Sequence, residues 1–129
     1  MISFDLGLFG PAEILKLSVL DEQEEIAFYL LVPHCQDIYE IHTHFHPQAY
    51  GSAVEISKKM LQYLFSTLPL LETLVTKVPI NNPLAKRLAK KCGLKLYGVL
   101  PNSFKLEDDS MIAQEMFYIS RKDVLCQSY

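Results

Sequence analysis

The chain has 129 residues, of which 50% are hydrophobic and 21% are charged, and its formal net charge is −3. This length predicts one domain, residues 1–129, and the apolar content is too high for a disordered chain. The acidic balance argues against a nucleic-acid-binding protein, which would need a basic face. No apolar run is long enough to cross a bilayer and no signal peptide is evident, so we expect no membrane association. Three widely spaced cysteines without a paired motif fit a reducing cytoplasm.

The first half of the chain has the alternating pattern of antiparallel strands. Residues 14–20 place apolar side chains at every second position, and residues 26–33 form a continuous apolar run. Residues 38–46 alternate again, with polar turns between the three segments. We therefore expect a three-stranded meander, and a short strand near residues 2–6 is also possible. One side of the third strand would carry Glu40, His42, His44 and His46.

The spacing of apolar residues then changes to that of a helix. From about residue 49 to residue 67, apolar side chains recur every three or four positions and predict a long amphipathic helix. Residues 72–79 are strand-like again, and they lie far enough along to pair in parallel with residues 38–46 through a right-handed crossover. Two further strands are predicted at residues 94–101 and 112–120.

A second, shorter helix is marked at both of its ends. Asn82 is a suitable N-cap, Pro83 occupies the first helical position, and Gly93 is placed to end the helix. We expect its buried side to consist of Leu84, Leu88 and Cys92.

The segment between the third strand and the long helix is rich in small residues. Small side chains let the backbone approach a pyrophosphate, where N–H groups and the positive end of the helix dipole meet the negative charge. This chemistry predicts a phosphate or pyrophosphate site within residues 46–55, which read HPQAYGSAVE.

These two segments together resemble the Gcn5-related N-acetyltransferase (GNAT) superfamily. The family pattern [Q/R]-x-x-G-x-[G/A] matches at Gln48, Gly51 and Ala53. A second pattern, N-x-x-[S/A] followed by Gly and an apolar residue, matches at Asn82, Ala85, Gly93 and Leu94. The tripeptide Ala-Val-Glu after the loop is similar to one common in the branch that acetylates ribosomal-protein N-termini. The resemblance extends from about residue 25 to the C-terminus.

The resemblance implies an α/β fold with a mixed, mostly antiparallel central sheet, helices on both faces, and N-terminal helices reduced or absent. We expect one helix on each face. The implied function is acetyl-CoA-dependent N-acetyl transfer to an amine, in a small molecule or a protein, by direct attack in a ternary complex. The strands at residues 38–46 and 72–79 would splay apart and hold the pantetheine arm. The residues implied in cofactor binding are Phe45, Gln48, Ala49, Tyr50, Gly51, Ser52, Ala53, Asn82, Ala85 and Lys91, with Lys86 as a further candidate.

Acyl transfer needs a base for the acceptor ammonium, directly or through water. Glu40 is the first candidate because relatives often place a glutamate on this strand, and His44 and His46 are the next because imidazole titrates near neutrality. Many relatives have a tyrosine seven residues after the asparagine as general acid, whereas this chain has Ala89 there. The alternative acids that remain are Tyr97, Ser103 and Tyr118.

Two other functions remain open at this point. The missing tyrosine and short N-terminal region favour a catalytically inactive binding or assembly protein of the same fold, such as occurs in phage genomes. The histidine row suggests a zinc or iron site, although residues i and i+4 on a strand are about 13 Å apart, too far to share one ion without a bend. We expect no metal, and a homodimer formed through edge strands is plausible.

Overall fold

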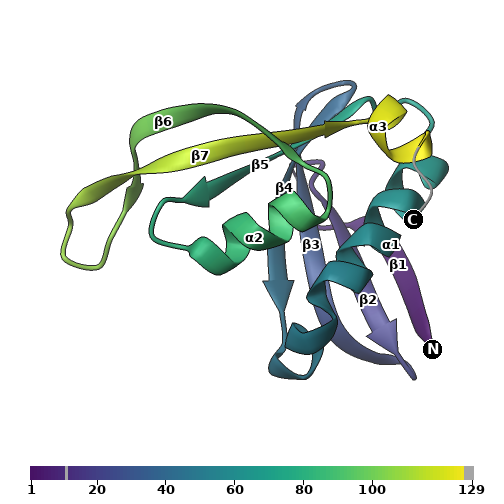
Figure 1. Ribbon diagram of the computed structural model, residues 1–129. Helices are drawn as coiled ribbons and strands as arrows, with labels where there is room; N and C mark the ends of the chain where they lie inside the picture. Colours follow the sequence, from purple (N-terminus) through teal and green to yellow (C-terminus); the bar gives the residue numbers. More distant parts are fainter. Residues whose placement is uncertain (11, 127–129) are drawn as a thin grey trace.

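The computed structural model describes residues 1–10 and 12–126, which form one seven-stranded sheet with its helices packed against it (Figure 1). The strand order is β1-β2-β3-β4-β5-β7-β6, and only the β4–β5 pair is parallel. The sheet is therefore mixed and mostly antiparallel, as predicted. Its strands are β1 (Ile2–Leu8), β2 (Leu15–Asp21), β3 (Glu24–Cys35), β4 (Ile38–Phe45), β5 (Thr73–Pro79), β6 (Lys95–Lys105) and β7 (Met111–Ser120). The helices are the 3-10 helix η1 (Pro47–Ser52), α1 (Ala53–Thr67), α2 (Pro83–Lys91) and α3 (Arg121–Leu125). No described helix is long and apolar enough to cross a membrane.

The first four strands form the predicted meander, and the short N-terminal strand is present as β1. Each of these strands pairs antiparallel with the next, from β1 through β4. The tight turn between β2 and β3 places Glu22 and Gln23 at φ values of 50° and 69°. No helix precedes β2 in the described residues, in agreement with the expectation of reduced N-terminal helices.

Both longer helices lie on the same face of the sheet, which corrects the expectation of one helix on each face. Side chains of α1 and α3 pack with the inward residues of β2, β3, β4 and β5 in one core cluster. Ala89 of α2 packs beside it against Val78 and Phe117. Figure 1 shows both helices in front of the sheet. We call this side the helix face and the opposite side the open face.

Strands β4 and β5 pair over only three residues and then separate. The parallel ladder joins Ile38 to Thr73 and ends where Glu40 faces Val75. Just beyond, the Thr76 hydroxyl donates to the carbonyl of Ile41 at 3.2 Å. No further β4–β5 ladder pair follows in the described chain, so a gap opens between residues 42–45 and 77–79. The predicted splay of these two strands is confirmed.

Helix α2 has the ends that the sequence predicts, and its predicted buried side is confirmed at Leu88 and Cys92 but not at Leu84. The Asn82 side chain accepts a hydrogen bond from the Ala85 amide at 3.1 Å, and Gly93 follows the helix with a φ of 90°. Leu84, expected in the core, is 72% exposed. Ala85 and Ala89 complete the buried side in its place.

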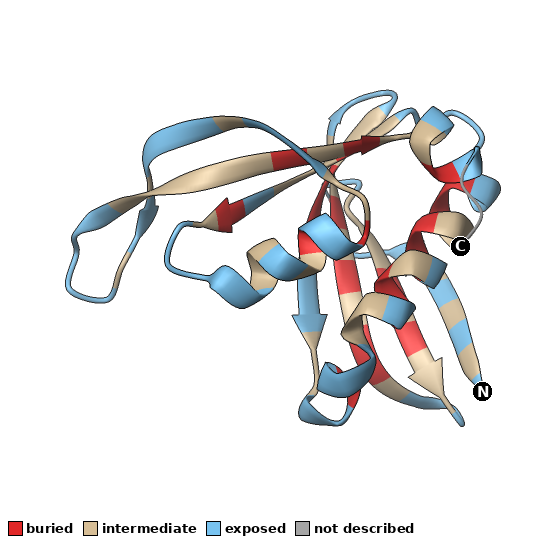
Figure 2. Ribbon diagram, in the orientation of Figure 1, coloured by how far each residue is buried: buried red, intermediate tan, exposed pale blue. Residues whose placement is uncertain are grey.

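The β6–β7 hairpin extends from the body of the molecule as an arm (Figure 1). Strand β6 is an edge strand, and most of its residues are exposed, as the pale colour in Figure 2 shows. Several apolar side chains are among them: Leu96, Tyr97, Val99 and Leu100.

Candidate functional site

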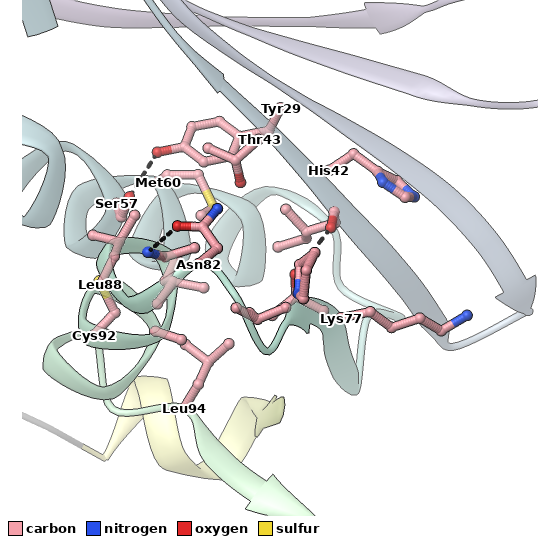
Figure 3. Close-up of a pocket in the computed structure, with 17 residues that line it drawn as sticks. Tyr29, His42, Thr43, Ser57, Met60, Lys77, Asn82, Leu88, Cys92 and Leu94 are labelled. Carbon is pink, nitrogen blue, oxygen red and sulfur yellow. Dashed lines mark hydrogen bonds between the residues drawn. The ribbon is translucent and has the colours of Figure 1, made fainter. Parts of the chain in front are cut away.

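A pocket of about 290 Å³ lies between α1, α2 and the gap in the sheet (Figure 3). We call it the central pocket. Thr43 and Thr76 belong to its helix-face side, whereas the neighbouring His42 and Lys77 point to the open face, because successive strand residues alternate. In Figure 3 the side chains of His42 and Lys77 extend away from α1 and α2. The pocket therefore borders the gap from the helix face, and the other side of the gap is reached from the open face.

The helix-face wall of the central pocket is mostly apolar, with a few polar groups. Met60, Leu88 and Ala89 supply apolar surface. Asn82 also lines it, and because its Oδ1 caps α2, its Nδ2 remains as a donor. Such a wall, apolar with few orienting polar groups, is typical of a ligand pocket.

Two weakly acidic groups that line the pocket, the Tyr29 phenol and the Cys92 thiol, stay protonated at neutral pH. Tyr29 and Ser57 share a buried hydrogen bond of 2.9 Å between their hydroxyls, and burial raises the pKa of the Tyr29 phenol. Burial also raises the pKa of the Cys92 thiol to about 11. At neutral pH this thiol is therefore a poor nucleophile.

The open-face side of the gap carries a cluster around Glu40. This carboxylate is only 8% exposed. Its Oε1 lies 2.9 Å from His34 Nε2 and 3.4 Å from Lys77 Nζ, and its Oε2 lies 3.0 Å from His42 Nε2. Three strands, β3, β4 and β5, thus bring their polar side chains to one carboxylate at the end of the β4–β5 ladder.

The three residues predicted as bases lie in different surroundings. Glu40 is enclosed by its cluster and does not line the central pocket. The His44 ring stacks on Phe28 with centroids 4.9 Å apart, and His46 Nε2 contacts Glu25 Oε1 at 3.3 Å. Neither histidine lines the pocket. His42 does line the pocket. The sequence predicts that His42 shares a strand face with Glu40 and His44, but it does not mark His42 as a candidate base.

The segment predicted to bind pyrophosphate is a 3-10 helix instead of an open turn. The Ala49 amide donates to the His46 carbonyl and the Ala53 amide to the Tyr50 carbonyl, so these two donors are used locally. Gln48 Nε2 donates to Glu24 at 3.2 Å. A Cβ on Gly51 would meet nothing within 4 Å. The segment lies beside the start of α1, outside the central pocket, so phosphate binding there stays a prediction.

The other residues implied in cofactor binding are divided between the pocket and the surface. Asn82 and Ala85 line the central pocket. Phe45 is half-buried, with its ring edge-on to Tyr29 at 6.0 Å. Lys91 is exposed, and Lys86 pairs with Glu115 at 3.0 Å.

The candidate general acids lie outside the central pocket. Tyr97 and Tyr118 pack edge-to-face at 5.7 Å on the β6–β7 arm, and the Ser103 hydroxyl donates to the Leu100 carbonyl at 2.8 Å. Ala89, at the place of the family's tyrosine, lines the pocket and is buried. The hydroxyls that line the pocket belong to Tyr29, Thr43, Ser57 and Thr76.

The histidine row does not converge on a metal site. His42 contacts Glu40, and the rings of His44 and His46 pack edge-on with centroids 5.1 Å apart. No group of three or more His, Cys, Asp or Glu side chains among the described residues has the arrangement of a metal centre.

Solved structures with a similar fold are bacterial polyamine acetyltransferases. A mutant of the spermidine/spermine N-acetyltransferase SpeG from Vibrio cholerae matches with a TM-score of 0.79 and 22% identity, over 92% of this chain and 73% of that one. The spermidine N-acetyltransferase from Vibrio cholerae in complex with CoA and spermine matches with a TM-score of 0.76 and 23% identity, over 87% and 68%. The chain has the acetyltransferase fold. Neither a protein-family model nor a curated protein sequence matches it.

The gap and the central pocket lie together at the place where the resemblance implies that the pantetheine arm is held. The order of elements along this chain is β4, η1, α1, β5 and α2. This is the order that the resemblance implies, with β4 and β5 as the strands that separate. At 22–23% sequence identity, the similarity to these structures shows the fold alone.

Proposed function

We propose that this protein is an acetyl-CoA-dependent N-acyltransferase that acts on an amine. One observation carries the proposal: β4 and β5 separate after three ladder pairs, and the gap is bordered by a pocket on one face and by His42 and Lys77 on the other. A transfer in a ternary complex needs both substrates to be bound at once with their reacting atoms in contact. The gap provides such a meeting point, and the acetyltransferase fold supports the choice of substrates.

In this proposal the acyl-pantetheine end of acetyl-CoA occupies the central pocket. Asn82 Nδ2 and the small Ala85 side chain fit it, because the first can donate to an amide carbonyl and the second leaves room. A pocket of about 290 Å³ is too small for the whole molecule, so the nucleotide would lie outside it, over η1 and the start of α1. The candidates there are Phe45, Gln48, Ala49, Tyr50, Gly51, Ser52, Ala53 and Lys91. Bound acetyl-CoA supplies an acyl group activated as a thioester.

The acceptor amine would approach from the open face. No helix covers this face in the described chain, so it can admit a large acceptor such as a polypeptide N-terminus, as the ribosomal-protein branch implies. A polyamine would need free carboxylates to match its several charges, whereas Glu40 beside the gap is already paired with Lys77 and two histidines. We therefore favour a protein amine. Release of free thiol with peptide amines, but not with spermidine, is the expected result.

Asn82 offers a test of binding that is separate from folding. Asn82→Asp retains the side-chain oxygen that caps α2 but replaces the amide donor, so stability should be preserved while acetyl-CoA binds about five- to tenfold more weakly, the effect of one net hydrogen bond. Isothermal titration calorimetry measures the change. Asn81→Asp, one residue earlier and outside the pocket, makes the same change of charge and should bind normally. Equal affinities for the two variants would remove Asn82 from the site.

We also propose a homodimer through strand β6. This edge strand exposes apolar side chains, including Val99 at 56%, and unpaired edges of this kind favour association. Val99→Lys should halve the mass measured by light scattering, whereas Ser3→Lys on the opposite edge, β1, should not. A monomeric wild type would refute the dimer.

A second candidate function is binding without turnover, which the absence of a tyrosine at Ala89 favours. Acetyl-CoA would then raise the melting temperature through linkage while thiol release stays at background. For location we propose the cytoplasm, a compartment in which Cys35, Cys92 and Cys126 stay reduced; they form no disulfide in the part of the chain that the structure describes.

A further inference from the structure

The cluster around Glu40 divides the two oxygens of the carboxylate between different tasks. Oε1 contacts His34 from β3 and Lys77 from β5, at 2.9 and 3.4 Å. Oε2 contacts His42, two residues further along β4, at 3.0 Å. The first oxygen thus fixes the carboxylate from both neighbouring strands, and the second is left for the imidazole that borders the gap.

His42 differs from the other imidazoles of the molecule in what surrounds it. It borders the central pocket and its side chain is 56% exposed on the open face. Its Nε2 faces Glu40, and Nδ1 has no hydrogen-bond partner in the described part of the chain. The rings of His44 and His46 are directed to Phe28 and Glu25, away from the pocket. His34 has its Nε2 on Glu40 and lies outside the pocket lining.

Glu40 itself is poorly placed to take a proton from a substrate. It is nearly buried, does not line the pocket, and has Lys77, His34 and His42 against its two oxygens. A carboxylate beside Nε2 favours the imidazole tautomer with its hydrogen on that nitrogen, which leaves the lone pair on Nδ1. Among the described residues, Glu40 is the charged group that contacts His42, and His34 and Lys77 contact the other oxygen of the same carboxylate.

We propose that His42 is the base that takes the proton from the acceptor amine, and that Glu40 is a positioning residue that sets its tautomer. This proposal rests on the acyltransferase function proposed above. The acceptor ammonium gives one proton to His42 Nδ1, and the neutral amine forms its N–C bond to the thioester carbon. The C–S bond then breaks with its electron pair on sulfur, which takes the second proton from nitrogen and leaves as a thiol. His42 finally returns its proton to solvent.

Substitution of His42 separates this role from binding. His42→Gln should lower kcat about 100-fold or more, because general base catalysis contributes roughly 10²- to 10⁴-fold, while the acetyl-CoA dissociation constant from calorimetry stays the same. Imidazole added to His42→Gly should restore part of the rate, which a merely structural role would not allow. His44→Gln, on the same face but outside the pocket, decides between the two histidines. Loss of rate in His44→Gln with full rate in His42→Gln overturns the proposal.

The role of Glu40 has a readout that does not depend on turnover. The ¹⁵N shifts of the His42 ring should report one tautomer, with hydrogen on Nε2, in the wild type and a mixture in Glu40→Gln. The rate of Glu40→Gln should fall with KM for the acceptor unchanged. A wild type that does not bind acetyl-CoA, or binds it without turnover of any amine, refutes the proposed function and this inference together. A wild type that turns over, with His42→Gln unimpaired, refutes the inference alone.

Discussion

Ala85→Phe abolishes acetyl-CoA binding, whereas Leu84→Phe leaves it unchanged: this is the result that we expect if the central pocket is the cofactor site. Ala85 lines the pocket from α2, and the adjacent Leu84 is 72% exposed on the other side of the same helix. A phenyl ring at position 85 would fill the space assigned to the acyl-pantetheine arm. We expect binding to weaken at least 100-fold, about 2.7 kcal/mol. Isothermal titration calorimetry measures it.

The two variants introduce the same residue at adjacent positions of one helix, so the comparison tests the pocket. Overpacking at position 85 could cost about 1–3 kcal/mol of folding free energy, and urea denaturation of both variants must therefore accompany the binding measurement. If Ala85→Phe folds and binds acetyl-CoA like Leu84→Phe, the central pocket is not the cofactor site. Loss of binding in both variants would implicate the whole helix instead of the pocket.

The sequence predicts most reliably those parts of the fold that are determined locally. The Asn-Pro start and the Gly end of α2 act through its own backbone, and both are present in the structure. The alternation in β2 and β4 likewise gave the correct strands. The buried side of α2 was obtained only in part, because Leu88 and Cys92 were predicted correctly and Leu84 was not. Leu84 and Ala85 are both acceptable core residues, and only the positions of β5 and β7 decide that Ala85 turns inward.

For the candidate bases, the sequence predicts which face of β4 carries them, but not which single residue borders the gap. Alternation correctly placed Glu40, His42 and His44 on one side of β4. Which of them borders the gap depends on where the parallel ladder stops, and it stops at Glu40 because β5 diverges there. That divergence is a property of two strands far apart in the sequence. The enclosure of Glu40 by His34 and Lys77 is also tertiary, since these come from β3 and β5.

The divergence of β5 depends in turn on how its start is held, and Arg121 is the residue that holds it. Its Nε donates to the Leu71 carbonyl at 2.8 Å and its Nη2 to the Leu68 carbonyl at 2.6 Å, and the guanidinium lies over the Phe65 ring. Next to this loop, the Glu72 amide donates to the Asp37 carbonyl at 2.8 Å and closes the narrow end of the gap. Arg121 therefore ties the end of α1 to the start of β5.

Arg121→Met should reduce the free energy of unfolding by about 2–4 kcal/mol. Two hydrogen bonds to a charged group contribute roughly 3–6 kcal/mol together, and we expect less because the Arg121 side chain is 22% exposed and water can replace part of the loss. Methionine retains apolar contact with Phe65. The loss of stability therefore reflects the Leu68 and Leu71 carbonyls, which lose their hydrogen-bond donors in a site only partly open to water. Lys122→Met, an exposed neighbour in the same helix, should stay within about 0.5 kcal/mol of the wild type. Urea denaturation compares the three proteins. Equal midpoints would mean that water replaces the guanidinium without cost, and that the separation of β4 and β5 is set by the sheet alone.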